Sequence, residues 1–211
     1  MSFGYIGDIS TKIKQQVKNT GILSISEAFD LERQGFLGGS IELIQSQTVS
    51  GVASVQFTSI KGSEYDNHLM ECVNLSLDSD NSNIRFDVRF SSDGGSSFPN
   101  SSYHYGFHYF ESDGTTFGEL RSANATEINN VLFSSDTSST CNGRLLFYNL
   151  NDSTSYSYMT SHTTSYFAST EHTLIFGGGG RQITESVDGI IIFTHNSANF
   201  SGTVNLYGIK E

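Results

Sequence analysis

The chain has 211 residues, of which 36% are hydrophobic and 16% are charged, and its 22 acidic and 11 basic side chains give a formal net charge of −11. This negative charge repels a phosphate backbone, so we expect no nucleic-acid partner. The length fits one β-domain with a short extension, and a surface of Ser, Thr, Asn and Gly is typical of exposed β-structure with many turns.

The N-terminal part of the chain carries a helical pattern. Residues Asp8–Asn19 are predicted to form a helix, because Ile6, Ile9, Ile13 and Val17 are spaced by three and four positions. A helix of about three turns with so narrow an apolar stripe is marginal alone and must pack on something. Two surfaces are open at this stage: the chain's own β-domain, or equivalent helices of an oligomer or a neighbouring protein.

A second helix is predicted shortly before the β-domain. Ser24 lies three residues before Glu27, as in a capping box, and Phe29 lies on the apolar side that follows. Gly38 and Gly39 then form a hinge or tight turn. We expect this region to act as a helical anchor or oligomerisation segment, residues 1–40. Its expected assembly residues are Ile6, Ile9, Ile13, Val17, Phe29, Gly38 and Gly39.

From residue 41 onward, short apolar runs alternate with turn residues, which predicts an antiparallel β-sandwich or jelly roll over residues 41–211. The clearest alternation runs from Ile84 to Phe90, where Arg85, Asp87 and Arg89 are expected to face water. The predicted strands are Ile41–Val49, Ala53–Ile60, His68–Leu77, Ile84–Phe90, Tyr103–Phe110, Ile128–Phe133, Arg144–Asn149, Ser155–Met159, Thr173–Phe176, Val187–Thr194 and Gly202–Lys210.

The tract Gly177–Arg181 contains four successive glycines. A phosphate-binding glycine loop needs a following helix and a Lys–Ser/Thr pair, and neither is present. We therefore expect a flexible loop here.

No metal or cofactor is expected. His104 and His108 lie on a predicted strand, where positions i and i+4 are ~13 Å apart and cannot share one ion within the chain. The segment Leu77–Asn83 begins like a calcium loop, but it lacks the central glycine, and its twelfth position, Arg89, is not the required glutamate. A polar turn is the better interpretation.

The remaining signals exclude further classes. Cys72 and Cys141 lack metal-ligand spacing and are expected to be buried thiols. The apolar run Ile190–Phe193 is far shorter than the ~20 residues that cross a membrane, so no membrane insertion is expected. The N-terminus shows no secretory signal, which predicts synthesis in a cytoplasm.

The sequence offers little catalytic chemistry. It contains no Gly-x-Ser-x-Gly elbow, and we expect no enzyme activity, although facing carboxylates depend on the fold and stay open. Tyrosines are concentrated in the middle of the chain, where exposed rings suit sugar or protein contacts and buried rings fill the core. They are Tyr103, Tyr105, Tyr109, Tyr148, Tyr156, Tyr158 and Tyr166. Tyr103, Tyr105 and Tyr109 are the candidate contacts to a glycan or partner.

Four segments of the chain resemble a β-sandwich module of virion proteins in tailed bacteriophages, especially marine ones. They are Ile41–Ile44, Tyr65–Leu69, the hairpin-like Arg89–Phe98 and the C-terminal Asn199–Lys210. Together they span most of the predicted β-domain.

The resemblance implies a non-enzymatic virion structural protein, made in the host cytoplasm and attached to other virion proteins through residues 1–40. It would form a homo-oligomer, with a trimer favoured. The tail or fibre apparatus is the first expectation, and a capsid decoration or head-fibre protein is the alternative. A different class is a lectin-like module for host surface glycans, which predicts a concave tyrosine-lined groove. A glycan-cleaving enzyme would instead show two facing carboxylates.

Overall fold

The computed structural model describes residues 41–79, 84–112, 114, 117–134, 137, 139–167 and 171–210. The predicted helices and all seven expected assembly residues lie outside this part of the chain, and so do residues 80–83 of the calcium-like segment. The predicted division near residue 40 stays a prediction. In the described ranges no helix is long and apolar enough to cross a membrane.

The described ranges contain twelve strands. They are β1 (Ile41–Val52), β2 (Ser54–Phe57), β3 (Asn67–Leu77), β4 (Ile84–Ser91), β5 (Tyr103–Glu111), β6 (Gly118–Ala125), β7 (Ile128–Ser134), β8 (Cys141–Tyr148), β9 (Tyr156–Phe167), β10 (Glu171–Thr184), β11 (Gly189–Thr194) and β12 (Phe200–Ile209).

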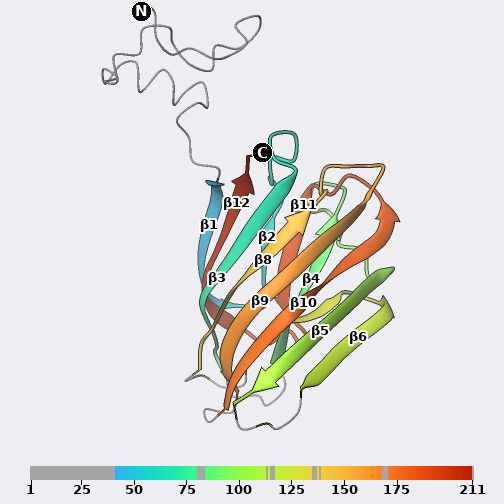
Figure 1. Cartoon of the computed structure of the whole chain (residues 1–211). Helices are drawn as coiled ribbons and strands as arrows, with labels where there is room; N and C mark the ends of the chain where they lie inside the picture. The colour runs from blue at the N-terminus through green and yellow to red at the C-terminus, as the bar shows by residue number, and fades with distance from the viewer. Residues whose placement is uncertain are drawn as a thin grey trace, which may run out of the picture. The chain divides into compact units, whose positions relative to one another are not determined.

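The strands form two antiparallel sheets. The large sheet has the order β1-β12-β3-β8-β9-β10-β5-β6, and the small sheet has the order β2-β11-β4-β7. Figure 1 shows β2, β11 and β4 of the small sheet behind the broad large sheet. This is the antiparallel β-sandwich that the sequence predicts.

The core lies between the two sheets and is rich in aromatic rings. Phe86 of β4 meets Phe200 of β12 edge to face, with ring centroids 5.0 Å apart. Phe90 of the same strand meets Phe147 of β8 at 6.1 Å in a similar arrangement. All four rings are fully buried. Such pairs between facing sheets contribute beyond their buried area, so β4 is held tightly against the large sheet.

Strand β9 is longer than the sequence predicts, because its inward positions are polar. Ser161 and Thr163 point into the sandwich, and both hydroxyls donate to the Val131 carbonyl oxygen of β7, at 2.9 and 3.0 Å. Hydrogen bonds satisfy these buried groups in place of apolar packing. The apolar alternation used for strand prediction therefore ends early. Edge strand β6 was missed for a related reason, since it carries few apolar residues.

The glycine tract is a strand, and the prediction of a flexible loop is wrong. Gly177–Gly180 lie within β10, which pairs with β9 on one side and with β5 on the other. A Cβ atom on Gly178 would lie 2.6 Å from the Met159 carbonyl oxygen of β9, and one on Gly180 would lie 2.6 Å from that of Ser157. Glycine in a strand interior often marks such a close approach of a neighbouring backbone.

The residues of β4 that are predicted to face water are less exposed to solvent than expected. Asp87 is fully buried, and Arg85 and Arg89 are half-buried. Asp87 does lie on the face opposite Phe86 and Val88, as the alternation requires, but neighbouring polar side chains cover it.

Candidate functional site

Three glycines interrupt the side chains on the outer face of the large sheet. Leu174 and Phe176 of β10 are each 37% exposed, so Gly178 and Gly180 continue the same outward face at two-residue spacing. Gly178 pairs with Gly106 of β5, which also faces outward. No side chain rises from these three positions, and the sheet is hollowed at Gly178 and Gly180.

The hollow is a groove of about 520 Å³, which we call the glycine groove. Its lining residues are His104, Tyr105, Ser122, Ala123, Tyr156, Tyr158, Met159, Thr160, Gly178, Gly179, Gly180, Arg181 and Gln182. This volume falls within the range of small-molecule binding sites, which lies at roughly 300–1,000 Å³.

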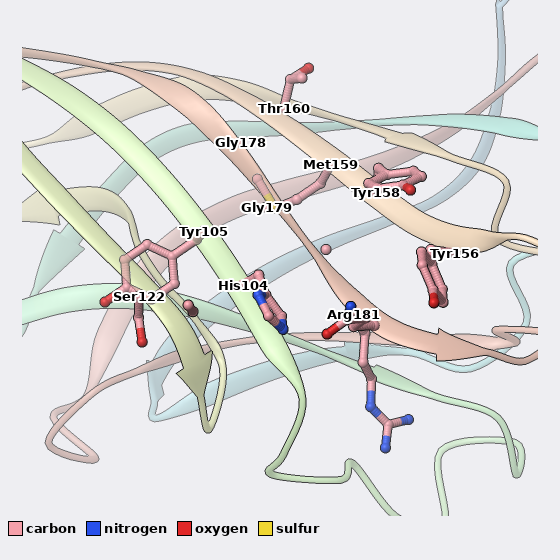
Figure 2. A pocket seen from close by; sticks show the side chains of 13 residues that line it. His104, Tyr105, Ser122, Tyr156, Tyr158, Met159, Thr160, Gly178, Gly179 and Arg181 are labelled. Carbon is pink, nitrogen blue, oxygen red and sulfur yellow. The ribbon is translucent and has the colours of Figure 1, made fainter.

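Aromatic rings border the glycine groove on the β9 side. Tyr156 and Tyr158 are 38% and 47% exposed, and their ring centroids lie 6.5 Å apart at an interplanar angle of 76°. The register places Tyr158 opposite Gly180, which in turn lies opposite His104 of β5. Figure 2 shows the two tyrosines on one side of the glycine strand and His104 on the other.

One row beyond Gly178, the same face carries a stacked aromatic cluster. Phe176 stacks on His108 and on Phe110, with centroids 5.7 and 5.5 Å apart. Phe110 meets Phe117 edge to face at 4.6 Å, and Phe117 is 71% exposed. Exposed aromatic groups gathered beside a groove are typical of binding surfaces.

The groove lining carries no carboxylate among the described residues, although the chain has a net charge of −11. Its outward polar groups are the hydroxyls of Tyr156, Tyr158 and Thr160, the Gln182 amide and the His104 imidazole. Arg181 is only 6% exposed, because its guanidinium pairs with Glu185 and lies 5.8 Å from the centroid of the Tyr103 ring. The open surface is therefore neutral, apolar on its broad faces and hydroxyl-rich at its rim.

The three predicted tyrosine contacts have different positions. Tyr103 lies in the core, where its hydroxyl accepts a hydrogen bond from the Phe90 amide at 2.9 Å, and a buried ring offers no surface to a glycan. Tyr105 belongs to the groove lining, but it is half-buried and its side chain packs against the core, on the face of β5 opposite His104 and Gly106. Tyr109 packs against the core, with its ring in the space above Gly118.

Comparisons with protein-family models, with curated proteins and with solved structures found no match for this chain. The site therefore rests on its own geometry.

The groove is not apparent from the sequence, because the segments that form it are distant from one another along the chain. Tyr156 and Tyr158 belong to the wider tyrosine set, but only the pairing of β9 with β10 places them beside the glycines. The sequence pattern that could have indicated the groove is the alternation of Tyr156, Tyr158 and Thr160, followed later in the chain by a glycine tract without side chains.

A second cluster of chemical groups lies on the outer face of the small sheet. Asp87, Glu127 and His195 place one ligand atom each within 4.8 Å of one another. Asp87 and Glu127 are also the kind of paired carboxylates that a glycosidase needs. Both are buried, with 0% and 5% exposure. Whether they could bind a metal ion or act on a glycan therefore depends on whether their oxygen atoms are free of other hydrogen bonds.

Donors already occupy these oxygens. The backbone N–H of Asn130 donates to Asp87 Oδ1 at 2.9 Å, and His195 Nδ1 lies 3.0 Å from Oδ2. The side-chain amide of Asn129, in the orientation that turns its nitrogen toward Asp87, donates to both oxygens at 2.7 and 3.0 Å. Arg89 pairs with Glu127 at 2.6 Å. Burial raises the pKa of Asp87 to about 6. We interpret this cluster as a satisfied structural network that secures β4 to β7.

The remaining candidate residues have structural surroundings. His104 and His108 both face outward on β5, four positions apart, as predicted. Cys72 and Cys141 are free and buried, which confirms the prediction, and burial raises the pKa of the Cys72 thiol to about 12. Asp78, in the calcium-like segment, accepts a hydrogen bond from the Ser201 hydroxyl at 2.8 Å.

Proposed function

We propose that this chain is a non-enzymatic structural protein of a tailed-phage virion, whose exposed β-sandwich binds host surface glycans through the glycine groove. Residues 1–40 would attach it to other virion proteins as a homo-oligomer. The tail or fibre apparatus is the favoured position.

One observation carries the glycan proposal: the bare floor of Gly178 and Gly180 beside the exposed rings of Tyr156 and Tyr158. A sugar ring has an apolar face that packs on an aromatic ring and hydroxyls that need hydrogen-bond partners. The groove supplies both, because Tyr158 offers a ring while Thr160 offers a hydroxyl and Gln182 an amide. The glycine floor gives a flat ring room to approach the backbone.

The virion part of the proposal has different support. It depends on the resemblance of four segments to phage virion modules, and the sandwich architecture is compatible with that resemblance. A protein on a particle surface that contacts a host cell needs a rigid scaffold with a shallow exposed groove, and the large sheet offers one.

The binding test uses the purified full chain on an array of bacterial and algal surface glycans. We expect the parent chain to bind at least one of these glycans. We expect Tyr158→Ala to weaken that binding at least about tenfold, since an aromatic ring that the ligand covers contributes ~1.4 kcal/mol or more to the binding free energy. Tyr166→Ala is the matched control, because Tyr166 is 53% exposed on the same strand and face but lies outside the groove. Equal losses in both variants, or no binding by the parent chain, would contradict the proposal.

The virion part is tested separately. Mass spectrometry of purified particles should detect the chain. Deletion of residues 1–39 should leave a folded sandwich that no longer joins particles, as judged by circular dichroism and by particle composition. Normal incorporation of the truncated chain would show that attachment does not depend on that segment.

A further inference from the structure

A second groove opens on the outer face of the large sheet, on the other side of β9. It has a volume of about 470 Å³, and we call it the Arg144 groove. Its lining includes Glu71, Asn142, Arg144, His162 and Thr163. The outward residues of β9 separate it from the glycine groove, with Thr160 in one lining and His162 in the other.

The two grooves are close enough for one chain-like ligand. Met159 lines the glycine groove and Thr163 lines the Arg144 groove, and four residues along a strand span ~13 Å at ~3.3 Å per residue. The grooves share a sheet face, and β9 is continuous between them. A single sugar would fill only one groove, whereas an oligosaccharide of several units would reach both.

The Arg144 groove differs from the glycine groove in its charge. Arg144 is exposed and forms no ion pair with any described carboxylate, in a protein whose other described basic side chains are paired except for Arg85. Its neighbours across the strands are Glu71 of β3 and His162 of β9. A guanidinium beside an imidazole and the amide of Asn142 is a donor-rich setting suited to an oxyanion.

The carboxylate of Glu71 lies near Arg144 and would repel an anionic ligand, but its hydrogen bonds direct it toward the neighbouring strand. Its Oε2 atom accepts hydrogen bonds from the Asn205 amide at 3.1 Å and from the Tyr207 hydroxyl at 3.2 Å. Those donors belong to β12, on the side of β3 away from Arg144. The carboxylate is thus engaged away from Arg144, although the two residues are in register.

We propose that the two grooves together bind one anionic oligosaccharide, with an uncharged ring over the glycine groove and a carboxylate or sulfate group at Arg144. This inference depends on the proposed glycan function. Charge complementarity argues for it, because an unpaired surface arginine is conspicuous in a chain of net charge −11.

The test compares neutral, uronic-acid, sialylated and sulfated oligosaccharides on one array, and then titrates the best acidic binder before and after its charge is removed by carboxyl reduction or desulfation. We expect the acidic form to bind more tightly, and we expect added salt to reduce that advantage. Arg144→Gln should weaken the acidic form about tenfold or more, through the loss of charge-assisted hydrogen bonds, and should leave the neutral form unchanged. Arg85→Gln is the matched control, because it removes the same charge from the other sheet without breaking an ion pair.

Each outcome decides the matter. Preference for acidic glycans that Arg144→Gln removes and Arg85→Gln keeps supports the inference. Equal binding of charged and uncharged forms, or equal losses in the two arginine variants, overturns it while leaving glycan binding intact. If no glycan on the array binds, the inference and the proposed function both fail.

Discussion

The replacement Gly180→Ala distinguishes a packed strand from a flexible glycine loop by the sign of its effect. In a loop with permissive backbone angles, Gly→Ala stabilises a protein by about 0.4–1 kcal/mol, because it restricts the unfolded chain. In β10 the added Cβ would lie 2.6 Å from the Ser157 carbonyl oxygen and 3.0 Å from the Tyr158 ring. A backbone atom cannot move aside cheaply, so β9 and β10 must separate.

We expect Gly180→Ala to lower the free energy of unfolding by about 1–3 kcal/mol, as is typical of overpacked positions. Gly106→Ala is the matched control, because Gly106 faces outward on the adjacent strand and its Cβ would meet nothing within 4 Å. Neither glycine has a positive φ, so backbone strain does not separate them. We expect the control to be neutral or slightly stabilising.

The assay is urea unfolding at equilibrium, with the midpoint and slope compared among the three proteins. For a domain of this size, 1 kcal/mol also corresponds to about 2–4 °C in Tm. A Gly180→Ala protein as stable as Gly106→Ala would refute the close packing of β9 on β10, and with it the floor of the groove.

Three further predictions follow from the core and the buried polar groups. Burial raises the pKa of Asp87 from 3.8 to about 6, so folding favours the protonated carboxyl; the resulting stability is full below about pH 4 and is lost as pH rises to about 6. The free energy of unfolding of Asp87→Asn, relative to that of the parent chain, should therefore rise by on the order of 2–3 kcal/mol between pH 4 and pH 7, as measured by urea unfolding. A difference that stays constant with pH would contradict this. The thiols of Cys72 and Cys141 should resist a thiol reagent in the native protein and react fully in denaturant, and rapid native labelling would show that they are accessible. Phe86→Ala should cost about 3–5 kcal/mol of unfolding free energy, and a cost below about 1 kcal/mol would place this ring outside the core.

The sequence was informative where one face of a strand is apolar and the other polar. Strand β4 begins at Ile84 as predicted, because its inward residues alternate through Phe90. The alternation did not predict how Asp87 is buried, since partners from β7 and from the segment after β11 cover it. Burial of a polar residue depends on long-range neighbours, and local periodicity does not contain them.

At the glycine tract, local sequence propensity predicted the wrong secondary structure. Glycine has no side chain to alternate and weakens an isolated strand, so local propensity favours a loop at Gly177–Gly180. Pairing with β5 and β9 on both sides overrides that propensity. The same pairing brings Tyr158 beside Gly180, so the strand and the candidate site were missed together.

The most direct test of the account is to follow backbone amide chemical shifts of the full chain during titration with the glycan that gives the strongest array signal. If the glycine groove binds the glycan, we expect saturable shifts that are largest at Gly178, Gly180 and Thr160. Shifts confined to other surfaces, or no saturable shift in the large sheet, would contradict the claim that the glycine groove is the binding site.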